Sequence, residues 1–142
     1  LADNGILDRW MVAGKNKVKL LNVNKKGSAN LFFKDSSATI WDMPSGGFVE
    51  SISIGLPTFS FWNKKFIKYQ PEAKKEIKEL LKVGILNKDG ETMAKNVELC
   101  LNDNQWINQI PRKKILNNFL SNYVKTNNDW KIQWKSLINT LR

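Results

Sequence analysis

The chain has no histidine and only one cysteine among its 142 residues. The lack of histidine removes the commonest general base, the commonest zinc ligand and any Ser-His-Asp triad. The single cysteine, Cys100, cannot form an internal disulfide, and it lies in an apolar helical pattern with Val97 and Leu101. We therefore expect a buried thiol in a reducing compartment, and we expect no metal site.

The sequence also has no apolar run near the roughly 20 residues that span a bilayer, and no signal-peptide pattern opens it. It does not begin with methionine, and its first residues, Leu1 to Asn4, resemble the middle of a chain. We expect a fragment or a processed chain. The expected location is the cytoplasm, with peripheral contact to the inner face of an anionic membrane as an open alternative.

What the chain does have is 42% hydrophobic residues and a net charge of +10. That apolar content is enough for the core of one domain, and 25% charged residues argue against intrinsic disorder. The charge is uneven, because the part after residue 63 holds 16 Lys and Arg against 8 Asp and Glu. A lysine-rich, solvated helical surface explains it. An anionic membrane or acceptor is an alternative, and nucleic acid is the least favoured partner.

Two segments, residues 38–43 and 58–62, have the apolar, β-branched and aromatic character of buried strands. Between them stand a glycine-rich turn at residues 44–47 and a short helix expected over residues 48–53. Two strands joined through a helix run parallel. The pattern therefore predicts a βαβ unit.

The second half of the chain is predicted to be mainly helical, with proline, aspartate and glycine marking the helix ends. Helices are expected from Pro71 to Gly84, after Asp89, from Pro111, and after Asn128 or Asp129, with a short edge strand at 83–86. Before residue 38 the patterns predict a helix that ends at Gly14, a strand at 17–23 and a short helix after Ser28. The expected fold is α/β: a partial, Rossmann-like parallel sheet of about three to four strands with a C-terminal helical layer. One domain would span residues 1–142, with a βαβ-type portion at 1–86 and helices at 87–142.

The turn Ser45-Gly46-Gly47 places backbone N–H groups at a helix N-terminus, which suits a phosphate or carboxylate. Without any ligand, the glycines also permit a tight turn and close packing of helix on strand, and Ser45 is a suitable N-cap. The Gly-x-Gly-x-x-Gly and Gly-Lys-Ser/Thr fingerprints are absent. Glu50, expected at about the first turn of the helix, is either a partner of the cap or an acceptor for a ribose diol.

Polar residues also follow both predicted strands: Asp42 follows the first, and Asn63 and Lys64 follow the second. Open parallel sheets bind ligands at the carboxyl ends of their strands, so these residues are placed to contact a ligand. The predicted ligand site consists of Asp42, Ser45, Gly46, Gly47, Phe48, Glu50, Asn63 and Lys64. No catalytic residue is assigned.

From Asp42 through Trp62 and on to Gly84, the sequence resembles the C-terminal, donor-nucleotide half of GT-B glycosyltransferases. It looks most like transferases of bacterial surface-carbohydrate and capsule synthesis. The residues that carry the resemblance are Pro44-Ser-Gly-Gly47, Glu50, Gly55-Leu-Pro57, Phe61-Trp-Asn63, Glu72-Ala, Leu80-Leu-Lys-Val-Gly-Ile85 and Asp129-Trp-Lys-Ile-Gln-Trp-Lys135. The resemblance covers roughly residues 30–142.

This resemblance implies a nucleotide-activated sugar as donor substrate and no other cofactor. By carry-over, the 45–47 turn would face the donor phosphate, and Glu50 the donor ribose or sugar. The family's donor domain has more strands than are found here, and its acceptor domain is absent. A partner chain or a missing N-terminal acceptor domain would therefore complete the site and supply the general base. Two alternatives stay open: a basic α/β module that binds nucleic acid or other polyanions, and a non-catalytic remnant of the transferase.

Overall fold

The computed structural model describes residues 6–15, 17, 30–63, 65, 68–124 and 129–140. The chain divides into two compact units, Leu1–Leu31 and Phe32–Arg142. In the first unit, helix α1 (Ile6–Gly14) confirms the helix predicted to end at Gly14. The strand predicted at 17–23 lies outside the described residues, apart from Lys17, which is not in a strand.

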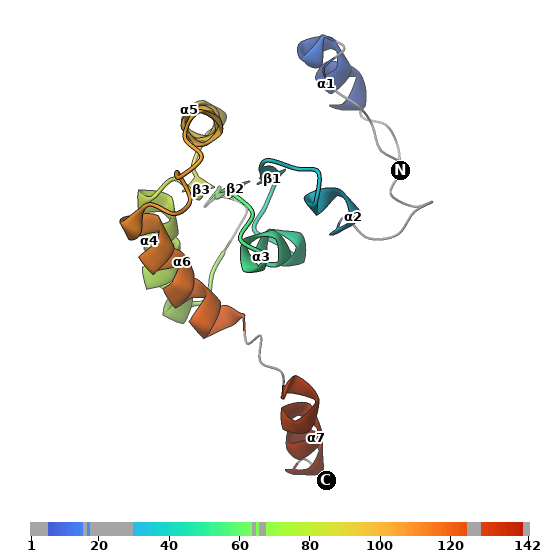
Figure 1. The fold of residues 1–142 in the computed structure, drawn as a ribbon, viewed down its shortest axis with the longest axis vertical. Helices are drawn as coiled ribbons and strands as arrows, with labels where there is room; N and C mark the ends of the chain where they lie inside the picture. Colours follow the sequence, from blue (N-terminus) through green and yellow to red (C-terminus); the bar gives the residue numbers. More distant parts are fainter. Residues whose placement is uncertain are drawn as a thin grey trace. The chain divides into compact units, whose positions relative to one another are not determined.

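The second unit contains a parallel sheet of three strands, β1 (Thr39–Trp41), β2 (Thr58–Phe61) and β3 (Leu86–Asn87), in the order β1-β2-β3. Thr39 pairs with Thr58, and Ser60 pairs with Leu86. The predicted βαβ unit and its parallel pairing are therefore confirmed, and so is the Rossmann-like α/β arrangement (Figure 1). The strand expected at 83–86 begins later, at Leu86.

Helices lie on both faces of this sheet. Helix α3 (Gly46–Ser53) connects β1 to β2, and α4 (Lys74–Lys82), which follows the 3₁₀ turn η2 (Pro71–Ala73), connects β2 to β3. Figure 1 shows α3 and α4 on one side of the strands and α5 (Gly90–Asn102) on the other. The remaining helices are α2 (Asn30–Phe33), α6 (Ile110–Tyr123), which packs on α4, and α7 (Trp130–Thr140). The predicted helices of the second half are thus confirmed.

The core lies between the sheet and these helices. Its buried members are Phe48, Ile52, Phe59, Trp62, Leu80, Ile85, Leu86, Met93, Cys100, Trp106 and Leu116. Cys100 is buried as predicted, and this burial raises the pKa of its thiol. The prediction that Leu101 shares this apolar pattern with Cys100 is wrong, however, because Leu101 is 57% exposed. Along a helix, Cys100 and Leu101 point about 100° apart, so only one of them faces the sheet.

The sheet is covered unevenly, and the prediction that β1 is a buried strand is wrong for one of its faces. Helix α5 packs mainly on β2 and β3. Phe59 of β2 is therefore 0% exposed, whereas Ile40 of β1, its neighbour in register, is 55% exposed. The alternation of strand side chains places both residues on the same face, and α5 covers only one of them.

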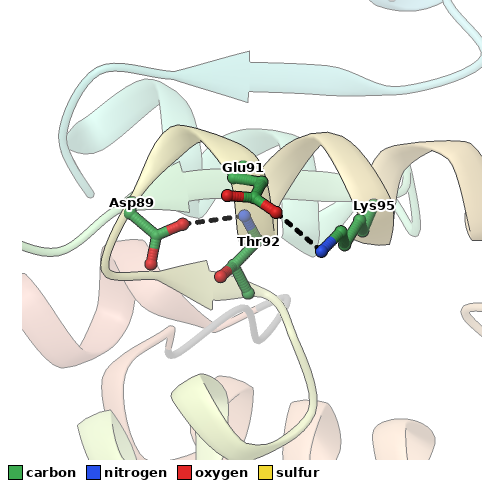
Figure 2. A network of polar contacts seen from close by, with 4 residues as sticks. All are labelled: Asp89, Glu91, Thr92 and Lys95. Atoms are coloured by element: carbon green, nitrogen blue, oxygen red, sulfur yellow. Dashed lines mark hydrogen bonds and ion pairs between the residues drawn. The ribbon is translucent and has the colours of Figure 1, made fainter.

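Helix α5 begins at the predicted cap. The Thr92 N–H donates to Asp89 Oδ1 at 2.8 Å, and Lys95 Nζ lies 2.8 Å from Glu91 Oε1 one turn further on (Figure 2). The ion pair is exposed and contributes little, whereas the cap satisfies a backbone donor that has no acceptor within the helix. At the end of α4, Gly84 has φ +78°, the left-handed conformation expected of the predicted C′ glycine.

The Asp89 cap should make stability depend on pH. The hydrogen bond from the Thr92 N–H lowers the pKa of Asp89 below its ordinary value of 3.8. Because the folded pKa lies below the unfolded one, the stabilisation is fully present above the unfolded pKa, and it is lost as the pH falls through the folded pKa. In thermal unfolding, the Tm difference between wild type and Asp89→Ala should be largest near neutral pH and should shrink as the pH falls below the ordinary pKa of 3.8.

Asp89→Asn is the matched control, because it keeps an acceptor oxygen without the charge. Its Tm at neutral pH should lie between those of the wild type and Asp89→Ala. A Tm deficit of Asp89→Ala that stays constant from neutral to acid pH would contradict a charged cap.

Candidate functional site

The predicted site lies where β1 leads into α3, and a chain of buried and half-buried hydroxyl groups fixes this junction. Thr39 Oγ1 donates to Thr58 Oγ1 at 3.1 Å, and Thr58 Oγ1 lies 3.1 Å from Ser51 Oγ on α3. Ser51 is fully buried and also accepts a hydrogen bond from Trp41 Nε1 at 3.2 Å. Because satisfied buried polar groups specify one arrangement, these contacts set the position of α3 against both strands.

Gly47 is required by packing. A Cβ on this residue would lie 2.1 Å from Cη2 of Trp41 and 2.5 Å from Cζ3 of the same ring. The indole of Trp41 therefore lies directly against the helix backbone, and only glycine leaves room for it. This close contact is the structural role that the sequence offered as the alternative to a phosphate contact.

Gly46 differs from its neighbour. It is exposed, and no atom lies within 4 Å of the position that a Cβ would occupy. Its backbone is helical and its φ is not positive. Nothing in the described part of the fold therefore explains a glycine here, whereas close approach of a ligand to the backbone would explain it.

The N-terminus of α3 has no side-chain cap. Ser45 holds the predicted N-cap position with extended backbone (φ −100°, ψ −171°), but its hydroxyl makes no capping hydrogen bond. Within the described residues, no acceptor binds the N–H groups of Gly46, Gly47 or Phe48. These three donors, at the positive end of the helix dipole, can bind an anion.

Two predicted site residues take different positions from those expected. Phe48 is 1% exposed, and its ring packs edge-to-face on Phe119 with centroids 6.4 Å apart, so only its backbone is available to a ligand. Glu50 was expected in the first helical turn, but α3 starts at Gly46, and its first turn has no acidic residue. The proposed capping role of Glu50 is therefore wrong.

Glu50 is instead exposed, and within the described parts of the chain its carboxylate has no hydrogen bond or ion pair. It is four residues beyond Gly46, and residues at this spacing lie on the same helix face, about 5–6 Å apart. The uncapped helix start and a carboxylate acceptor are therefore side by side on an exposed surface.

The remaining site residues follow the strands. Asp42 comes directly after β1 and is exposed. Asn63, just beyond β2, accepts a hydrogen bond from the Lys65 N–H on its Oδ1 at 3.0 Å, so part of its polar capacity is used in the turn. Parallel pairing puts both residues at the same sheet edge as the start of α3. Lys64 lies outside the described residues.

This arrangement provides N–H donors for an anion and carboxylates that can accept hydrogen bonds from hydroxyl groups. Among the residues that the structure describes, no group of three or more Cys, Asp or Glu residues is placed to hold a metal ion. The same part of the chain contains no helix with the length and apolar character needed to cross a membrane.

Sequence reasoning missed the role of Arg112. Its guanidinium lies 3.8 Å from the centre of the Trp106 ring, and its Nε donates to Val83 O at 3.1 Å. Its Nη1 donates to Trp106 O at 3.3 Å and to Gln109 Oε1, and burial lowers the pKa of the guanidinium. The available signal was composition: arginine is rare in this lysine-rich chain, and a stacked, forked contact needs arginine.

Comparison with known proteins gives one family. The model of a family described as "LIC12162 family transferase" matches residues 9–138. No curated protein and no solved structure matches the chain.

Proposed function

The chain belongs to the LIC12162 family of transferases, and we propose that it binds the nucleotide-activated sugar in a glycosyl transfer. One observation carries the proposal: the N-terminus of α3, which no described side chain caps, lies one helical turn from the exposed carboxylate of Glu50, which has no partner among the described residues. Backbone N–H groups that can bind an anion, next to a carboxylate that can accept hydrogen bonds from hydroxyl groups, match a nucleoside diphosphate, which has phosphates next to a ribose diol.

In this proposal the helix start acts on the leaving group. Negative charge develops on the leaving nucleoside diphosphate as the bond between the anomeric carbon of the sugar and the phosphate oxygen breaks and the acceptor hydroxyl oxygen bonds to that carbon. The N–H groups of Gly46, Gly47 and Phe48 and the dipole of α3 would stabilise that charge without a metal ion. Because these donors are fixed by the packing of Trp41 and Ser51, they need no reorganisation during the reaction.

The finer assignment comes from the resemblance to GT-B enzymes of bacterial surface-polysaccharide and capsule synthesis. In that arrangement the acceptor binds to a separate domain, so we assign the general base for the acceptor hydroxyl to that domain or to a partner chain. Glu50 would accept hydrogen bonds from the donor ribose or sugar. Asp42 and Asn63 would border the same edge of the sheet.

The test is a thermal-shift and NMR titration of the chain with CMP, UDP, GDP and their sugar conjugates. We expect one nucleotide to stabilise the chain selectively. Glu50→Gln should weaken its binding about tenfold, because a hydrogen bond to a charged acceptor is replaced by a neutral one. Glu98→Gln, which removes an exposed carboxylate from α5, is the matched control and should bind like wild type.

A folded sample that responds to none of these nucleotides would overturn the proposal. Equal weakening by Glu50→Gln and Glu98→Gln would also contradict it, since the effect would then be one of net charge. Steeply salt-dependent binding to polyanions without any nucleotide response would instead favour a polyanion-binding module, in keeping with the net charge of +10.

A further inference from the structure

A cavity of about 540 Å³ lies at the carboxyl end of β3, between α4 and the start of α5. Apolar side chains of Leu81 and Leu86 line it together with the aromatic ring of Tyr69. Among the described residues proposed for the sugar donor, none lines it. Its size is that of small-molecule sites, and the carboxyl end of a parallel strand is where open α/β sheets bind ligands.

The rim of this cavity is basic. Lys78 and Lys82 come from α4, and Lys88 follows β3. Across the described chain, none of these lysines forms an ion pair. The acidic residue of the lining is Asp89, and one of its oxygens already accepts the Thr92 N–H. Three cations against one carboxylate favour an anion with more than one negative charge.

The aromatic ring of the cavity wall, that of Tyr69, is held in place by packing against Trp62. The ring of Tyr69 lies 5.5 Å from that of Trp62, with a tilt of 40°, and Trp62 is 4% exposed. Packing against a buried neighbour limits the rotamers of Tyr69 and gives the cavity a defined apolar surface. The cavity therefore combines a fixed apolar part with a cationic rim.

From this combination we propose that the cavity binds a small organic phosphate that has an aromatic or apolar group. The phosphate would lie among Lys78, Lys82 and Lys88, and the apolar group against Tyr69, Leu81 and Leu86. An inorganic ion would use only the rim, and a neutral aromatic molecule only the wall. This site is separate from the donor site, and the proposal does not rest on the proposed function.

The test is an NMR titration of the 142-residue chain with 1-naphthyl phosphate, alongside 1-naphthol and inorganic phosphate. We expect 1-naphthyl phosphate to bind more tightly than either of the other two probes. The largest shift changes should be at Tyr69, Leu86 and Lys88. Equal binding of 1-naphthol, or shift changes away from these residues, would overturn the proposal.

The double variant Lys78→Gln/Lys88→Gln tests the rim. It should weaken 1-naphthyl phosphate about fivefold, as expected for two exposed cations. Lys82 is kept, because it also lines a cavity between α4 and α6. Lys113→Gln, on the exposed surface of α6, is the charge control and should bind like wild type. Equal weakening in this control would reduce the effect to surface charge and overturn the proposal.

Two further probes distinguish the sources of such a phosphate. UDP represents a free nucleotide, and dihexanoyl phosphatidic acid represents a lipid headgroup. The one that competes with 1-naphthyl phosphate identifies the source. If the competing phosphate no longer displaces 1-naphthyl phosphate in Lys78→Gln/Lys88→Gln but still does so in Glu50→Gln, it binds in this cavity. If displacement is lost in Glu50→Gln and kept in the double variant, it binds at the donor site.

Discussion

Gly47→Ala is expected to destabilise the fold by about 3 kcal/mol. A methyl group at this position would lie 2.1 Å from the Trp41 ring, well inside van der Waals contact. Relief requires the indole to move, which would stretch its 3.2 Å hydrogen bond to Ser51 and expose the hydroxyl chain beneath α3. Urea denaturation followed by far-UV circular dichroism would measure the loss, and tryptophan fluorescence would report the movement of the ring.

The matched control is Gly46→Ala, the neighbouring residue in the same helix. An added methyl group meets no atom within 4 Å, so the free energy of unfolding should stay the same or rise by up to about 1 kcal/mol. The nucleotide response should nevertheless weaken, because the methyl group covers the exposed helix start.

An unfolding midpoint of Gly47→Ala equal to that of wild type would show that the Trp41 ring moves at little cost. Unchanged nucleotide binding in Gly46→Ala would count against the helix start as the phosphate site.

Phe59→Ala is expected to cost about 3–5 kcal/mol, the range for truncating a fully buried aromatic side chain. Phe59 is 0% exposed in the central strand, and its ring centroid lies 5.1 Å from that of Trp106. Domains of this size are stable by only about 5–15 kcal/mol, so the loss is a large share of the total stability. Phe59→Leu, which leaves a smaller cavity, provides a measurable value if the alanine variant does not fold.

Ile40→Ala is the control for that truncation, because Ile40 pairs in register with Phe59 on the same face of the sheet. Its side chain is 55% exposed, and its removal should cost less than about 1 kcal/mol. Urea denaturation measures both variants. A loss at Ile40 as large as that at Phe59 would mean that this face of β1 is covered in solution.

The strands and most helix ends could be predicted because their signals are local. Pro71, Gly84 and Asp89 act on the backbone within a few residues, and each marks the helix end that the structure contains. The start of α3 was placed two residues too late, because two glycines were taken as the turn itself. Glycine is a poor residue in a helix interior, but the first turn accepts it since its N–H groups have no helical partners.

Features that depend on distant segments could not be predicted. The exposure of Ile40 depends on how far α5 extends across the sheet, which no residue near Ile40 encodes. The hydrogen bond from Arg112 to Val83 O joins residues 29 apart in the chain, and the same guanidinium stacks on Trp106. In the candidate site, the residue types were found from local pattern, but the contact of Trp41 with Gly47 appears only when strand and helix are placed together.

The order of the strands affects how this domain forms during synthesis. Each strand of the sheet pairs with the next strand along the chain, so each described pairing can form once the following strand has been synthesised. As the chain leaves the ribosome, β2 can add to β1 and β3 to β2, and the nucleus of the domain can grow in one direction. The helix that covers the second face, α5, emerges last of these elements. Until α5 has been synthesised, Phe59 would be exposed in the growing chain. We expect aggregation or chaperone binding at this stage.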